Sequence, residues 1–507
     1  MPNTMDRATD SLSPIKRAQF GYPQAKHLLL RAGFGGSKEQ ITTLVEWGPE
    51  KAVDHLINFD EIPADPDGRD EFDHDIMRPL TRDERTQRRL ARQRRDEETI
   101  DQFRKLRQSA QRADRKQMRE IQKWWLTRMI QTPRPLEEKL TLFWHGHFAT
   151  GYRTIEDSYH MYAQNRMFRA NALGNFGQLL SNIIRDPAML RYLNNNQNRK
   201  ANPNENFARE IMELFSLGEG NYTENDIKGG ARALTGYTYD DDAFTFDKRN
   251  HDQTIKSILA EQGNLDGDGF VNAILRSRAC PAFICTKLYR FFVADIPLIP
   301  KEMPPVSRRY VSKMSNYLGA KRYELKPLMR KMLLSQHFYD PSVMNNKIKS
   351  PAELVVGAIR ALNTPTRDIT TLVEAMNKMG QALFAPPSVK GWDGGRAWIS
   401  TATMFVRQNT MVYLLTGRLP TGFNPKGMMQ QFNAVPLVRS LNDPSIDSPT
   451  RELIAADLLE SILGVHDEQL SNHIAKASQK PKQAPDDPRT LTAMTTLITS
   501  LPQYQLC

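Results

Sequence analysis

Helical periodicity runs through almost the whole chain and limits its possible folds more than any other feature. Apolar residues recur at three- and four-residue steps from Pro23 to Leu501, which places them on one face of an α-helix. Only Tyr237 to Phe246 alternates aromatic and polar residues as a short hairpin does. The strand–helix alternation of a Rossmann fold is missing, as are a P-loop and a Gly-x-Ser-x-Gly motif. We therefore predict a mainly α fold, a large multi-helical domain with a minor hairpin and long loops.

The composition is that of a soluble globular chain. Hydrophobic residues make up 39% and charged residues 25% of the 507 positions, and no apolar run is long enough for a transmembrane helix. Three cysteines are too few for a disulfide framework. The N-terminal residues lack the apolar core of a secretory signal, so we expect a cytoplasmic protein without a membrane span.

Linker-like and polar stretches suggest how the chain is divided. We expect residues 1–20 to form a disordered tail and residues 21–507 to form a single large helical domain. The looser composition after residue 419 makes 419–507 a possible C-terminal subdomain.

Positive charge is concentrated between Arg82 and Lys123. This segment carries 15 basic and 8 acidic residues and contains neither proline nor glycine, which predicts one long helix. Its apolar stripe is thin and is interrupted at Asp114. The stripe consists of Phe103, Leu106, Ala110, Met118, Ile121 and Trp125.

Such a helix has two interpretations. It could be a basic arm that binds nucleic acid, another polyanion or an anionic membrane surface. It could also be a solvated helix with pairs of opposite charge one turn apart. The acidic residues interrupt the basic patch and no aromatic residues alternate with the arginines, so we favour the solvated helix and consider nucleic acid an unlikely partner.

The first chemical motif is Trp144-His145-Gly146-His147-Phe148. Two histidines two positions apart cannot share one face of a regular helix, but at a helix end both rings can reach one cation. The alternative is a pair of buried histidines that bind backbone groups.

The second motif is the segment from Asn204 to Leu214. Glu210 and Glu213 lie one turn apart, next to an apolar stripe, and helical carboxylates in that position can hold a metal or act as acid and base. The alternative is a surface ladder in which Arg209 pairs with Glu205 and Glu213.

A third candidate is His251-Asp252, which could supply a ligand or base with a charged neighbour; a plain loop histidine is the alternative. The sequence from Asn264 to Gly269 starts like a calcium loop, but Leu275 stands where the bidentate glutamate belongs. We therefore expect a tight turn there.

Several blocks together resemble one large bacterial family, domain of unknown function 1800. The similarity covers roughly residues 20 to 507 and keeps the order of the blocks. The blocks are HLLLRAGFGGS, WWLTRMIQTPRPLEEKLTLFWHGHFAT, NENFAREIMELFSLGEGNYTENDIKGGARALTGYTYDD, HDQTIKSILAEQGNLDGDG, KIKSPAELVVGAIRAL, GQALFAPPSVKGWDGGRAWIS and SLPQYQLC.

The resemblance adds three expectations. The charged segment 82–123 looks like a variable helical insertion. Members often accompany proteins similar to secreted sulfatases or phosphatases, so a partner of that kind is possible, and many members look exported. The family pattern includes a set of polar residues that suggests a shared site. They are His145, His147, Glu205, Asn206, Arg209, Glu210, Glu213, Asp252 and Lys256.

The function predicted from these motifs is that of a metal-dependent enzyme, with a hydrolase favoured and the substrate unknown. The ligands of a divalent ion, zinc-, iron- or manganese-like, would be His145, His147, Glu210, Glu213 and His251. Glu205 or Asp252 would act as base, and Arg209 or Lys256 would stabilise negative charge. A di-iron oxidase is a variant that lacks the expected pair of Glu-x-x-His motifs.

Two other classes stay open. The chain could be a non-catalytic helical scaffold or an export partner, or it could bind polyanions through the basic helix. In the metal hypothesis, the segment from Trp144 to Phe148 must meet the segment from Glu205 to Leu214 in space.

Overall fold

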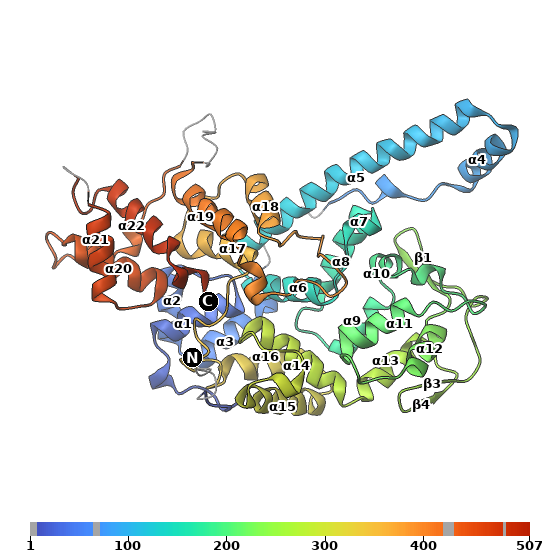
Figure 1. Cartoon of the computed structure of the whole chain (residues 1–507), viewed down its shortest axis with the longest axis horizontal. Helices are drawn as coiled ribbons and strands as arrows, with labels where there is room; N and C mark the ends of the chain where they lie inside the picture. Colours follow the sequence, from blue (N-terminus) through green and yellow to red (C-terminus); the bar gives the residue numbers. More distant parts are fainter. Residues whose placement is uncertain (1–7, 64–70, 419–429, 480–482) are drawn as a thin grey trace.

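Helices dominate the computed structural model, which describes residues 8–63, 71–418, 430–479 and 483–507 (Figure 1). These ranges contain 22 α-helices and two small two-stranded sheets. The mainly α fold predicted from the periodicity is confirmed. Among the described helices, none is long and apolar enough to cross a bilayer.

The first large apolar cluster joins the N-terminal helices to the middle of the chain. One part packs at the bottom of Figure 1 and the other extends to its right-hand side. The helices of the first part are α1 (Tyr22–Ala32), α2 (Lys38–Trp47), α3 (Pro49–Ile57), α14 (Ala279–Phe292), α15 (Pro305–Ala320) and α16 (Leu325–Leu334). Those of the second part are α8 (Ser158–Ala170), α9 (Phe176–Ile183), α10 (Pro187–Tyr192), α11 (Asn206–Glu210), α12 (Glu224–Ala233) and α13 (Gly267–Arg276).

The second apolar cluster contains the C-terminal helices, drawn in orange and red in Figure 1. Residues 419–429 and 480–482 of the possible C-terminal subdomain lie outside the described residues. The three helices after residue 430 share this cluster with the three helices that precede residue 419. The C-terminal helices of this cluster are α17 (Pro351–Leu362), α18 (Ile369–Lys378), α19 (Thr401–Thr416), α20 (Arg451–Leu463), α21 (Glu468–Ala477) and α22 (Pro488–Ser500).

Helix α6 (Pro135–His147) lies between the two clusters and is buried on every side. Leu140 and Trp144 belong to the first cluster, whereas Leu142 belongs to the second. A helix that is buried on every side is typical of the centre of a large protein, and its buried charged residues Glu138 and Lys139 are paired there. The histidine motif at its C-terminal end is therefore held by the core.

The N-terminal segment differs from the expected disordered tail. Residues 1–7 lie outside the described residues, but residues 8–20 pack against the body. Ile15 and Phe20 are buried, and the Asp10 carboxylate accepts hydrogen bonds from Arg309 and Lys313. Burial of apolar side chains and the ion pairs with α15 order this part of the segment.

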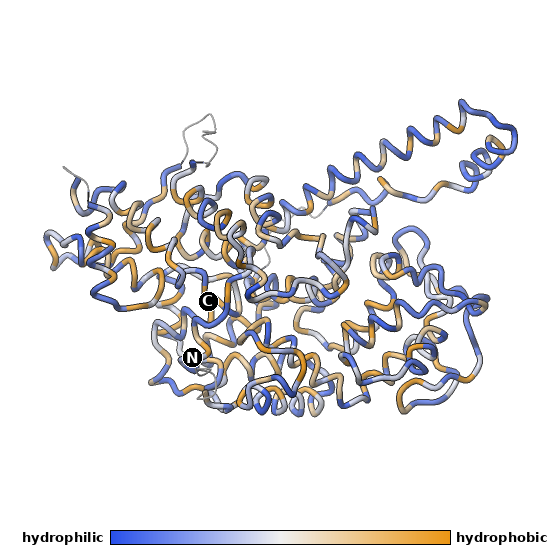
Figure 2. Tube along the Cα trace, in the orientation of Figure 1, coloured by the Kyte–Doolittle hydropathy of each residue, from blue (hydrophilic) through white to orange (hydrophobic). Residues whose placement is uncertain are grey.

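The charged segment forms two helices where the sequence predicted one. Helix α4 (Arg82–Arg94) ends at Arg95, which is left-handed with φ 56°, and α5 (Glu97–Gln131) begins where the Asp96 carboxylate accepts from Thr99 N. An N-cap aspartate can start a new helix without proline or glycine. The two helices form an arm that projects from the body (Figure 1), and most of this arm is hydrophilic (Figure 2).

Asp114 interrupts the apolar stripe of α5 because it anchors the arm to the body. It is 2% exposed. Its Oδ2 accepts from Tyr152 Oη at 2.6 Å, and its Oδ1 accepts from Ser158 N at 2.7 Å. These bonds tie α5 to α7 (Tyr152–Ile155) and to the start of α8.

Removing the outer arm should leave the body folded. Asp114 is the first buried residue of α5, so a Gly/Ser linker can replace residues 83–106. We expect the free energy of unfolding in urea to change by less than about 1 kcal/mol. Asp114→Ala should cost about 2 kcal/mol, since it leaves Ser158 N unpaired. Loss of cooperative unfolding in the deletion variant would contradict this.

The predicted hairpin is present as β1 (Tyr237–Asp240) and β2 (Ala243–Phe246), with Tyr237 opposite Phe246. A second hairpin, β3 (Lys256–Ile258) and β4 (Glu261–Gly263), was not predicted because its strands are only three residues long. The calcium-like sequence is a helix start: Asp266 caps α13 by accepting from Asp268 N and Gly269 N.

Candidate functional site

The two motif histidines lie at the end of α6 and face different neighbours. His145 accepts a hydrogen bond at Nε2 from Phe384 N at 3.0 Å. His147 Nε2 lies 2.9 Å from the carbonyl oxygen of Phe215 and donates to it. Residues two apart on a helix point in widely different directions, so the rings do not converge on one ion.

Both rings are neutral at ordinary pH, because burial lowers the pKa of each to about 3. In a neutral imidazole, one nitrogen carries the proton and the other a lone pair. The bond to Phe215 places the proton of His147 on Nε2. Its Nδ1 therefore keeps a free lone pair, and this buried atom has no partner among the described residues.

Two glycines join α6 to the loop that follows α18. Gly391 has φ +81°, and a Cβ there would lie 2.1 Å from the Gly146 carbonyl oxygen. A side chain would therefore be both strained and blocked. The next residue, Trp392, also packs against Gly146, with its ring 3.4 Å from a Cβ built there. The WHGHF and GWDGG motifs thus fit directly against each other.

A cavity of about 120 Å³ opens beside this contact. We call it the motif cavity, because three of the sequence blocks that carry the family resemblance line it. Each block contributes polar groups. The principal residues are His147, Lys287, Arg290, Lys347, Glu353 and Trp392.

Positive groups dominate the α14 side of the motif cavity. Burial, together with the charges of Arg290 and Lys390, lowers the pKa of Lys287 to about 8. Its Nζ lies 5.3 Å from the centre of the Phe283 ring. Arg290 donates at 3.4 Å to the carbonyl oxygen of Asp393, which leaves most of its five N–H groups for other partners. The Nε1 of Trp392 is a second buried group without a partner in the described part of the chain.

An ion cluster forms the inner wall and fixes α6 to α17. The Glu353 carboxylate accepts from Lys139 Nζ at 2.5 Å and from Ser350 N at 2.7 Å, and Lys347 lies 3.6 Å away. Burial alone would raise the pKa of Glu353, but the two lysines hold it well below its usual value. This carboxylate therefore stays ionised, and its ion pairs hold α6 and α17 together.

The histidine motif contacts Phe215, the residue directly after the predicted glutamate segment, through the His147 hydrogen bond. Residues 211–216 form the π-helix η6 (Ile211–Ser216), which changes the expected helical spacing. Glu213 accepts from Tyr222 Oη at 2.5 Å. Glu210 is half-buried, and burial and the Glu213 charge raise its pKa.

Arg209 makes the surface ladder that was the alternative interpretation, with one different partner. It donates to Glu205 at 3.2 Å and to both oxygens of Glu224, at 2.8 and 2.9 Å. Glu213, which the sequence offered as a partner, binds Tyr222 instead.

The third predicted group stabilises the loop between the two hairpins. His251 Nδ1 lies 2.8 Å from the Thr235 carbonyl oxygen. Arg232 donates to Asp252 at 2.7 Å, and Arg232 and Thr254 help to hold the Asp252 pKa far below normal, although burial opposes them. Lys256 donates to the Thr254 carbonyl and to Asn264 Oδ1.

Across the described ranges, no group of three or more His, Cys, Asp or Glu side chains is arranged to hold a metal ion. The three cysteines are buried free thiols. The geometry thus gives the predicted ligand set no support, and divalent-metal binding stays a prediction.

Sequence reasoning missed Lys287, Arg290 and Trp392. The GWDGG block indicated only a family resemblance, although glycines beside a tryptophan indicate a close approach of backbone to another element. Lys287 and Arg290 lie three apart in α14, which is an ordinary helical spacing without a recognisable motif.

The fold and the site describe a mainly α protein with a small polar cavity beside α6, whose lining also includes the carboxylates of Asp295, Glu353 and Asp393. The family model described as "Protein of unknown function (DUF1800)" matches residues 27–506, so the chain belongs to that family. No curated protein and no solved structure matches the chain.

Proposed function

We propose that this chain is a hydrolase that binds a small anionic substrate in the motif cavity. One observation carries the proposal: His147, whose buried Nδ1 has no partner among the described residues, lines the same cavity as Lys287 and Arg290. A proton acceptor close to cationic groups is the arrangement that hydrolysis of an anionic ester requires.

The residues divide the reaction between them. His147 Nδ1 takes a proton from a water molecule, whose oxygen bonds to the electrophilic centre of the substrate. Lys287 and Arg290 stabilise the negative charge, and the proton on Nδ1 passes to the departing oxygen. Burial and the Lys287 charge lower the His147 pKa to about 3; a bound anion offsets that charge and raises the basicity of His147.

A panel of p-nitrophenyl phosphate, sulfate and acetate tests the proposal. We expect wild type to hydrolyse at least one anionic ester and Lys287→Met to raise its KM at least tenfold. Lys105→Met is the matched control, because Lys105 is exposed on the arm and pairs with Asp101. Turnover of none of the esters, together with no inhibition or binding by phosphate or sulfate, would favour the scaffold or export-partner alternative.

A divalent zinc-, iron- or manganese-like ion stays a separate proposal. The free His147 Nδ1 is the atom best placed to contribute to such a site, since Nε2 of His145 and Nε2 of His147 bind backbone groups. Elemental analysis of the purified untagged chain, with and without chelator, is the direct test.

Polyanion binding is a second candidate function, favoured by a groove of about 710 Å³ along the arm. The groove lies between η4 (Asp75–Met77), α4 and α5. Asp75 is the acidic residue among its lining residues. The arginines that line it are Arg78, Arg88, Arg92, Arg104, Arg107 and Arg191.

A heparin titration at several salt concentrations tests the groove. Each phosphate- or sulfate-like contact adds to the slope of log K against log salt, so replacing groove arginines should flatten that slope more than replacing others. The groove variant is R88Q/R92Q/R104Q/R107Q, and the charge-matched control is R82Q/R85Q/R94Q/R112Q. Equal slopes for the two variants would show that only net charge matters.

A further inference from the structure

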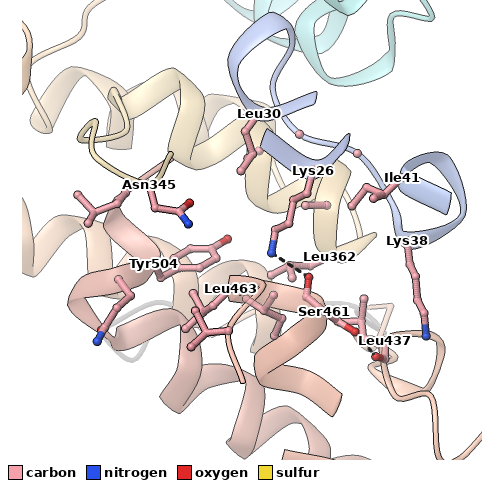
Figure 3. Close-up of a pocket in the computed structure, with 18 of the residues that line it drawn as sticks. Lys26, Leu30, Lys38, Ile41, Asn345, Leu362, Leu437, Ser461, Leu463 and Tyr504 are labelled. Carbon is pink, nitrogen blue, oxygen red and sulfur yellow. Dashed lines mark hydrogen bonds between the residues drawn. The ribbon is translucent and has the colours of Figure 1, made fainter. Parts of the chain in front are cut away.

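A second cavity, of about 210 Å³, lies between the N-terminal and C-terminal helices (Figure 3). We call it the α1–α20 cavity. Its walls come from α1, α17, α20 and residues 503–506 near the end of the chain. It has none of its lining residues in common with the motif cavity.

The walls combine an apolar surface with an excess of positive charge. Lys26, Lys38 and Lys349 line the cavity, and its described lining residues include no aspartate or glutamate. The apolar side chains around them include Leu30, Ile41, Leu362, Leu437, Ile462 and Leu463. Cations in an apolar cavity whose lining holds no carboxylate attract an anion.

Lys26 is the cation with unused hydrogen-bonding capacity. Its Nζ donates at 3.1 Å to the Ser461 carbonyl oxygen, as Figure 3 shows. An ammonium group has three N–H donors, and no other acceptor contacts this one in the described part of the chain. Burial and the Lys349 charge lower the Lys26 pKa to about 7, with Glu460 opposing them.

Lys349 adds positive charge but is already held. Its Nζ donates at 2.7 Å to the Tyr504 carbonyl oxygen and lies 3.9 Å from the centre of the Tyr504 ring. Its charge reaches Lys26, as the effect on the Lys26 pKa indicates. A ligand anion beside Lys26 would therefore be attracted by both lysines.

We propose that the α1–α20 cavity binds a medium-chain aliphatic carboxylate, with its headgroup at Lys26 and its chain against Leu30, Ile462 and Leu463. A carboxylate accepts the free N–H groups of Lys26, and the chain removes the apolar walls from water. An inorganic anion would bind only the lysine ammonium group, and a hydrocarbon would cover only the apolar walls.

Calorimetric titration with octanoate at constant ionic strength tests this inference. We expect saturable binding by wild type, at least tenfold weaker binding by Lys26→Met, and unchanged binding by Lys51→Met. Lys51 is a suitable control because it is exposed and lies over Trp47, outside the cavity. Circular dichroism of Lys26→Met checks that the variant is folded.

A chain-length series on wild type makes the test independent of any variant. Affinity should rise about fourfold per methylene from butyrate to octanoate, and octylamine should bind at least tenfold more weakly than octanoate. Equal binding of octanoate and octylamine, no effect of chain length, or phosphate binding as tight as octanoate would overturn the proposal. Unchanged octanoate binding by folded Lys26→Met would also overturn it.

Discussion

Replacing Glu138 with alanine is expected to lower the free energy of unfolding by about 3–5 kcal/mol. This carboxylate is fully buried in α6. It accepts hydrogen bonds from Arg128 Nε at 2.5 Å, Arg169 Nε at 2.6 Å and Trp125 Nε1 at 2.9 Å. The substitution would remove the carboxylate that Arg128 and Arg169 share and leave Glu137, 3.9 Å from Arg128, as the remaining carboxylate paired with the cluster. Removing one partner of a buried ion cluster is strongly destabilising.

Urea unfolding measures the loss, and Glu120→Ala is the matched control. Glu120 is exposed and pairs with Lys123, so its removal should cost less than about 1 kcal/mol. A loss below about 1 kcal/mol for Glu138→Ala would show that the cluster contributes little to the core.

The same cluster has a defined pH dependence. Burial alone would raise the Glu138 pKa, but Arg169 and Arg128 lower it below the ordinary value of 4.5. A lowered folded-state pKa gives stability that is present above the unfolded pKa and is lost as pH falls. The difference between wild type and Glu138→Ala should therefore shrink as the pH is lowered below about 4.5.

The His147→Gln variant should lose at least about 100-fold in kcat for the hydrolysed ester, with little change in KM. Glutamine can still donate to the Phe215 carbonyl, but it lacks the Nδ1 lone pair. Stability should therefore stay within about 1 kcal/mol of wild type. If His147 has only a structural role, the His147→Gln variant should instead keep its activity.

Two further variants separate the proton-acceptor role from the others. His147→Ala loses the bond to Phe215 as well, and should be less stable than His147→Gln by about 1–3 kcal/mol. His145→Gln tests the metal hypothesis. If His145 is a metal ligand, the variant should lose bound metal and activity together. In the structure, His145 instead accepts a hydrogen bond from Phe384 N.

The sequence predicted the helices well because each amphipathic helix repeats its pattern over several turns. It also predicted the first hairpin, because the alternation of aromatic and polar residues from Tyr237 to Phe246 is a local signal. It missed the helix break at Arg95 and the anchoring role of Asp114. The first depends on a single residue in a left-handed conformation, and the second on partners about 40 residues away.

The candidate site was predictable only in part. The histidine motif drew attention to His147, but metal ligation was inferred because the backbone partners of both rings are invisible in a sequence. Lys287 and Trp392 reach the cavity from segments 140 or more residues away from His147. Their convergence is produced by tertiary packing, above all by the contact of Gly146 with Gly391.

The central claim is that the motif cavity binds an anion beside His147, and a calorimetric titration with inorganic sulfate tests it most directly. The titration is performed at constant ionic strength on wild type, Lys287→Met and the control Lys105→Met. We predict saturable binding by wild type and the control, and at least tenfold weaker binding by Lys287→Met. Equal affinity in all three proteins, or no saturable binding by wild type, would contradict the account.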